Sequence, residues 1–157
     1  MSNIGIDLSA NDASPLWNLG TVITHETAAG TKKYKYIQYN AAAAAVAGVA
    51  GEVAYYATVA VGDATGTIVT SDLSDSDEMG AGVLQASLTD DYYGWIQVQG
   101  VATLTIALTA GSDGDQLTPT GATDGTLDVV VTTVALMDHC ATALDVSAKV
   151  IMCHFKH

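Results

Sequence analysis

The sequence predicts an all-β protein, a small antiparallel β-barrel or sandwich, and three observations support this. Between residues 80 and 131 apolar and polar residues alternate, with Ile96 and Val98 on one side of a strand and Trp95 and Gln97 on the other. A period of two in β-branched and aromatic residues is typical of half-buried strands. Asp-Gly pairs at 113–114 and 124–125 accept the positive φ of tight turns. Short strand-like runs also recur about every ten residues, as in barrels and sandwiches.

The first 16 residues are expected to form an extended N-terminal arm ahead of a single β domain, residues 17–157. The arm is rich in Asn, Asp, Ser and Pro, which favour loops, although Ile4, Ile6 and Leu8 alternate as in a short strand. Trp17 and Leu19, followed by Gly20, are expected to anchor the arm on an apolar surface. Two interpretations of Trp17 stay open: it closes one end of the core, or it contacts another subunit.

Two strands are predicted next, at 21–23 and 34–39, with a turn around Gly30 between them. Tyr34 and Tyr36 share a face, and Tyr39 falls out of phase at the strand end. Three of the five lysines, Lys32, Lys33 and Lys35, stand together here. A solvated strand start or turn is the simpler interpretation of this cluster, and a binding patch is the alternative.

Residues 41–50 are expected to form one short Ala-rich helix or an extended loop that packs on the barrel. Alanine favours helix, but a run of ten residues that includes Gly48 makes a marginal helix in water. Strands are then expected at 52–61 and 67–70, and an exposed acidic loop at 71–80. Leu104, Ile106 and Leu108 alternate with threonines, which predicts a further strand. The last strands are expected at 132–139 and 148–155.

The composition limits the classes of function. At 157 residues the chain is most simply one domain, and its 17 acidic residues, 5 lysines and no arginine give a net charge of −12. Nucleic-acid binders neutralise phosphates with clustered basic residues, so no nucleic-acid partner is expected. No apolar run is long enough to cross a bilayer, so no membrane partner is expected. The N-terminus has no secretion signal, which predicts synthesis in the cytoplasm and buried, reduced thiols at Cys140 and Cys153.

Known catalytic and metal-binding patterns are absent from the sequence, so no enzyme, cofactor or metal is expected. There is no G-x-S-x-G turn for a nucleophile and no G-x-x-x-x-G-K phosphate loop. The acidic run from Asp75 has Met79 where a calcium loop needs an oxygen ligand. The pairs 139–140 and 153–154 supply His and Cys without a zinc spacing. A hairpin centred near 144–145 would put Cys140 opposite residue 150, which argues against a disulfide with Cys153.

Several segments of the chain resemble the decoration, or cement, proteins of tailed-bacteriophage heads. These segments are W-x-L-G-T (17–21), Y-K-Y-I-Q (34–38), G-E-V (51–53), G-V-L-Q-A (82–86), Y-G-W-I-Q-V-Q-G (93–100), D-G-D-Q-L (113–117) and A-K-V-I (148–151). The resemblance implies a β-rich virion protein that forms homo-oligomers, commonly trimers, and bridges subunits of the major capsid protein on the outer capsid surface. It carries no catalytic residues. The residues expected to contact the capsid or another subunit are Ile4, Ile6, Leu8, Trp17, Lys32, Lys33 and Lys35.

The alternative from a different class is a receptor- or glycan-binding module on a virion fibre or tail. Four tyrosines suggest it, because flat aromatic rings stack on sugars: Tyr55, Tyr56, Tyr92 and Tyr93. Neighbouring residues on a strand point to opposite faces, so only half of them could serve. A small hydrolase is a third possibility, and a cleft with a strongly perturbed carboxylate would be its structural sign.

Overall fold

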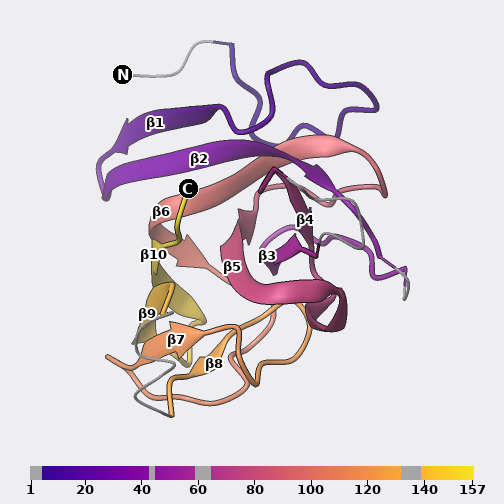
Figure 1. Ribbon diagram of the computed structural model, residues 1–157. Coiled ribbons are helices and arrows are strands. Elements are labelled where there is room, and N and C mark those ends of the chain that lie inside the picture. The colour runs from indigo at the N-terminus through magenta and orange to yellow at the C-terminus, as the bar shows by residue number, and fades with distance from the viewer. Residues whose placement is uncertain (1–4, 43–44, 59–64, 132–138) are drawn as a thin grey trace.

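The computed structural model describes residues 5–42, 45–58, 65–131 and 139–157, and it confirms the all-β prediction (Figure 1). Its helical element in this part of the chain is a single 3₁₀ turn, η2 (Leu73–Asp75). No helix there is long and apolar enough to cross a membrane. The strands are β1 (Val22–Thr27), β2 (Gly30–Tyr39), β3 (Val53–Ala57), β4 (Ile68–Thr70), β5 (Ser76–Leu84), β6 (Tyr93–Thr103), β7 (Gln116–Thr118), β8 (Asp128–Val129), β9 (Ala141–Asp145) and β10 (Val150–His154).

Five strands close into a barrel in the order β2-β4-β3-β5-β6, because β6 also pairs with β2. Four of the five pairings in this ring are antiparallel. The pairing of β2 with β4 is parallel, with Gln38 opposite Ile68. The predicted barrel is therefore present, with one parallel pair that the sequence pattern did not indicate. Strand β1 extends the sheet beyond β2.

Strand β6 belongs to both halves of the molecule. Its first part pairs with β2 and β5, and its last five residues, from Gln99 to Thr103, pair with β10. Strands β9, β7 and β8 follow β10 in the same ten-stranded sheet, and this part of the sheet lies below the barrel in Figure 1. The change of partner occurs at Gly100, which has φ +97°, and a Cβ there would lie 2.7 Å from the carbonyl oxygen of Thr31. This position requires glycine for conformation and for space.

The alternation of β2 and β6 divides the buried side chains into two clusters. Ile37, Tyr39 and Ile96 belong to the main core, which continues into the part of the sheet formed by β10, β9 and β7. Tyr34, Tyr36 and Trp95 form a separate aromatic cluster. The predicted shared face of Tyr34 and Tyr36 is confirmed, and so is the opposite orientation of Trp95 and Ile96. Both faces of β6 are covered, which explains why Trp95 is only 1% exposed.

Of the two structures predicted for residues 41–50, the described part (41–42 and 45–50) forms the loop. Ala42 and Ala45 have positive φ angles of 59° and 53°, which end any helical run. Gly48 bridges to Leu88, and a Cβ on it would lie 2.9 Å from the ring of Tyr39. Packing of this loop against the Tyr39 ring thus outweighs the helix propensity of alanine.

Three other predictions about elements need correction. Residues 104–109 form a loop that continues past the end of β6, and Leu104 in this loop is buried. The threonines here bind loop backbone instead of lying on a strand: Thr105 Oγ1 donates to the carbonyl of Ala50 at 2.6 Å. Residues 76–80 are the start of β5 rather than a loop. Asp72 is buried and caps η2 by accepting a hydrogen bond from the Ser74 amide. The strand predicted at 132–139 falls almost wholly outside the described residues.

Candidate protein interaction surface

The segment from Leu16 to Val22 carries the densest set of exposed large apolar side chains in the described chain. The described chain has nine exposed large apolar side chains, and four of them lie between residues 16 and 22: Leu16 (70% exposed), Trp17 (42%), Leu19 (38%) and Val22 (40%). Scattered apolar side chains are ordinary on protein surfaces, but a local concentration indicates an interaction site. We call residues 16–22 the apolar segment.

The aromatic cluster holds the apolar segment in place. The Trp17 ring meets the Trp95 ring edge-on, with centroids 6.2 Å apart, and Trp95 packs against Tyr36 at 5.0 Å. The Leu16 amide donates to the Tyr36 hydroxyl at 3.2 Å, and the Gly20 amide donates to the Tyr36 carbonyl at 2.8 Å. Trp17 thus has a buried edge and an exposed edge, so both interpretations of it remain compatible with the structure.

Residues 5–15 of the predicted arm lie on the barrel. Ile6 and Leu8 are partly buried against the aromatic cluster. Asp12 and Tyr93 exchange two backbone hydrogen bonds, of 3.0 and 2.9 Å. Ile6 and Leu8 therefore pack on the aromatic cluster rather than belong to the exposed apolar set, and Ile4 lies outside the described residues. Figure 1 shows this part of the chain crossing the barrel above β2.

The three clustered lysines occupy different environments. Lys32 and Lys33 are partly buried. Lys35 is only 8% exposed, and its Nζ donates to the Tyr56 hydroxyl at 3.0 Å and to the Gly66 carbonyl at 2.9 Å. The solvated interpretation is wrong for Lys35, because the register of β2 places it on the same face as Ile37.

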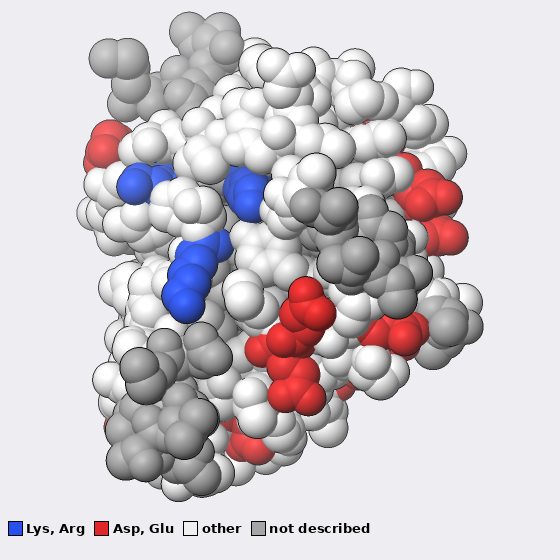
Figure 2. All heavy atoms as spheres, viewed as in Figure 1, with Lys and Arg blue, Asp and Glu red and all other residues white. Residues whose placement is uncertain are grey.

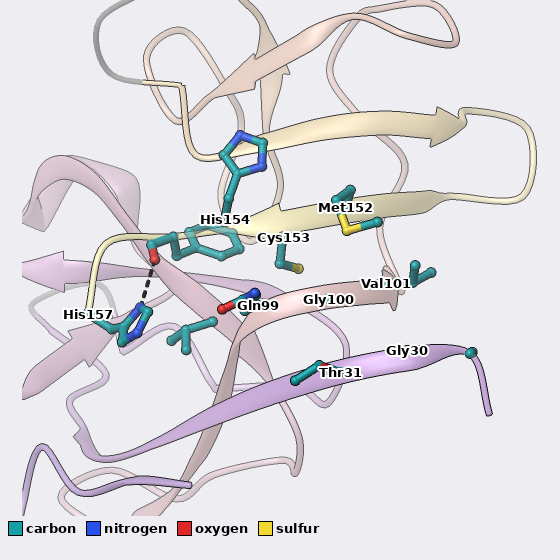
Figure 3. A pocket seen from close by; sticks show the side chains of 12 residues that line it. Gly30, Thr31, Gln99, Gly100, Val101, Met152, Cys153, His154 and His157 are labelled. Atoms are coloured by element: carbon teal, nitrogen blue, oxygen red, sulfur yellow. Dashed lines mark hydrogen bonds between the residues drawn. The ribbon is translucent and has the colours of Figure 1, made fainter. Parts of the chain in front are cut away.

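A groove of about 630 Å³ opens where β6 changes partner (Figure 3). The tip of the β1–β2 hairpin forms one wall and β10 the other, with Gln99, Gly100 and Val101 between them. Burial raises the pKa of the Cys153 thiol in this groove to about 12, so it stays protonated at neutral pH. Burial and the neighbouring His139 lower the pKa of His154, whose ring lies 5.0 Å from that of His139. The described residues that line the groove include no Asp, Glu, Lys or Arg.

The cysteines are buried free thiols, as predicted, although the predicted hairpin register is wrong. Cys153 pairs with Ala141, and the His154 amide donates to the Cys140 carbonyl. The turn between β9 and β10 is longer than the prediction assumed and is asymmetric, and it includes Lys149 with φ 58°. Over residues 5–42, 45–58, 65–131 and 139–157, no three His, Cys, Asp or Glu side chains are grouped so as to hold a metal ion.

One partly buried carboxyl group, that of Glu52, has a raised pKa. Burial raises the pKa of Glu52, and the nearby Asp124 adds to the rise. Glu52 accepts a hydrogen bond from the Val49 amide at 3.3 Å, and its carboxyl carbon lies 3.0 Å from where a Cβ on Gly125 would stand. The close packing of the Glu52 carboxyl group against Gly125 accounts for the burial that raises its pKa.

Sequence reasoning identified Trp17 and Leu19 as an apolar anchor but missed Leu16 beside them. The available signal was an L-W-x-L run between Pro15 and Gly20, two residues that favour loops. Comparison of the chain with protein-family models, with curated proteins and with solved structures found no match. A functional proposal therefore depends on the chain's own residues and on the resemblance described above.

Proposed function

We propose that this chain is a structural virion protein that decorates the outer surface of a tailed-phage capsid and stabilises it by bridging major capsid subunits. The observation that carries the proposal is the apolar segment, held on the aromatic cluster with Leu16 70% exposed. A decoration protein needs a preformed surface that binds the assembled lattice. Binding of that kind stabilises the lattice by mass action, and a site shared between subunits gains further from effective concentration.

The proposal includes the major capsid protein as partner, self-association into a homo-oligomer, most simply a trimer, and a location on the virion after synthesis in the host cytoplasm. The net charge of −12 supports a protein rather than a nucleic-acid partner. Light scattering on the purified protein is the first measurement, and a trimer mass is expected. A stable monomer would weaken the proposed oligomer and leave capsid binding as the deciding test.

Capsid binding is tested by co-sedimentation of the purified protein with undecorated capsid shells of the phage that carries it. Leu16→Ser and Leu19→Ser are expected to reduce the bound fraction strongly. Leu144→Ser is the matched control, because Leu144 is 43% exposed and lies on β9, outside the barrel. Wild-type protein that does not co-sediment would overturn the proposal. Equal binding by all three variants would overturn the role of the apolar segment.

Point substitutions separate binding from folding better than deletion of the arm. Removing residues 1–16 would take away Ile6 and Leu8 and uncover the aromatic cluster. Such a truncation is expected to destabilise the barrel as well as to weaken attachment. Leu16 and Leu19 are exposed enough that serine there should change stability by only about 0.5 kcal/mol or less.

The alternative of a glycan-binding module has less support from the structure. Tyr55 is fully buried and Tyr56 is 9% exposed, so neither offers a flat face to a sugar. Tyr92 and Tyr93 are partly exposed. A glycan array would test these two remaining rings.

A further inference from the structure

A buried lysine that has no carboxylate partner among the described residues lines a pocket beside the C-terminal segment. Lys35 is 8% exposed, and its ammonium group donates to two neutral oxygens, the Tyr56 hydroxyl and the Gly66 carbonyl. Its Nζ also lies 4.8 Å from the centroid of the Tyr56 ring. No Asp or Glu of the described chain is within ion-pair distance of this Nζ. These neutral contacts satisfy hydrogen bonds but leave the charge unbalanced.

The pocket has a volume of about 400 Å³. Besides Lys35, Tyr56 and Gly66, its lining includes Lys156, His157 and Asp77. Two of the five lysines of the chain therefore meet at one pocket of a protein whose net charge is −12. The Tyr56 hydroxyl donates to the Lys156 carbonyl at 3.0 Å, which ties the C-terminal segment to this site. Figure 2 shows basic side chains on this face, with acidic side chains on the same face as well.

A buried charge is costly unless it is paired, so the environment of Lys35 matches an anion that is supplied from outside the chain. We propose that this pocket binds a carboxylate group, with the Lys35 ammonium as its direct partner. One unbalanced positive charge matches one negative charge. Asp77 also lines the pocket, and its carboxylate repels a dianion such as phosphate more strongly than a monoanion. The pocket can also hold several atoms beyond the carboxylate. This site is independent of the proposed capsid function.

The carboxylate has two possible sources: a free small acid, or an Asp or Glu side chain of a partner protein. The test is a titration of ¹⁵N-labelled full-length protein at constant ionic strength, followed by amide chemical shifts. The three probes are acetate, a short peptide with blocked ends and one glutamate, and inorganic phosphate. Saturable shifts at Tyr56 and Gly66 are expected with acetate and with the peptide, and weaker shifts with phosphate. Tighter binding of the peptide would identify a protein side chain as the source, and tighter binding of acetate a free acid.

Lys35→Met removes the charge and keeps most of the length, and it is expected to weaken carboxylate binding about tenfold or more. Lys33→Met is the matched control, because Lys33 lies on the same strand and is partly buried but does not line the pocket. It should bind carboxylate as the wild type does. If Lys35→Met does not fold, the location of the shifts in the wild-type titration still decides the question.

Three results would overturn the proposal. One is the absence of a saturable shift at Tyr56 and Gly66 with either carboxylate, which would mean that the two neutral acceptors suffice for Lys35. Another is stronger binding of phosphate than of acetate. The third is an equal loss of binding in the Lys33 and Lys35 variants.

Discussion

Gly100→Ala should be strongly destabilising, and the structure allows its cost to be divided into two parts. The first part is the positive φ of +97°, which costs an L-residue about 1–2 kcal/mol. The second part is steric, because the new Cβ would lie 2.7 Å from the Thr31 carbonyl oxygen and 3.0 Å from Lys32 Cγ. Overpacking of this kind costs about 1–3 kcal/mol. The two parts together predict a loss of about 2–5 kcal/mol in the free energy of unfolding.

Gly114→Ala provides the matched control. Its φ of +91° is nearly the same, and no atom lies within 4 Å of the added Cβ. It should lose only the conformational part, about 1–2 kcal/mol. Urea unfolding, followed by tryptophan fluorescence, measures both variants under the same conditions. Equal losses in the two variants would refute the steric argument. A larger loss for Gly114→Ala would refute the assignment of Gly100 as the tight point between β6 and the β1–β2 hairpin.

Three further predictions concern buried polar groups. Because burial and Asp124 raise the pKa of Glu52, the native state holds its proton more tightly, so stability falls as pH rises from the unfolded pKa through the folded one. Glu52→Gln should therefore raise the unfolding midpoint at pH 7 and have no such effect near pH 4, and a midpoint gain that is independent of pH would contradict this. Cys153, with a pKa near 12, should resist thiol reagents at pH 8 until the protein unfolds, and rapid labelling of the native protein would count against its burial. Tyr55→Phe should lose about 1–3 kcal/mol in urea unfolding, because the Thr126 amide donates to the Tyr55 hydroxyl at 3.0 Å; an unchanged midpoint would mean that another acceptor replaces it.

The sequence allowed the fold class to be predicted because the period of two survives in the long strands. In β6 it separates Trp95 from Ile96, and in β2 it separates Tyr36 from Ile37. The same signal failed at 104–109, where alternating residues form a loop whose threonines bind backbone groups distant in sequence. It failed at 76–80 because charged residues at the exposed start of β5 resemble a loop. Contacts between residues that are distant in sequence cannot be predicted from the local pattern of apolar and polar residues.

The candidate interaction surface was only partly predictable, for a related reason. Trp17 and Leu19 were found because they are apolar residues just before Gly20 in a loop-like segment, and Leu16 could have been inferred from its place beside Trp17. Lys35 was misinterpreted because its charge suggested solvent, while its strand position directs it inward with Ile37. The unbalanced charge in its pocket becomes evident only when Tyr56 and Gly66, 21 and 31 residues away in sequence, are placed beside it.

The pairing of β2 with β6 also has a consequence for synthesis on the ribosome. The barrel cannot close until β6 is made, and residues 40–92, 53 in number, separate the two strands. At about 5–20 residues per second, translation of this interval takes roughly 3–11 seconds. During that time Tyr34 and Tyr36 lack their packing partner Trp95, and the aromatic cluster that contacts the apolar segment is incomplete. The nascent chain is thus most prone to aggregate in the interval between these two strands, and a chaperone that binds aromatic residues near the N-terminus would act in that interval.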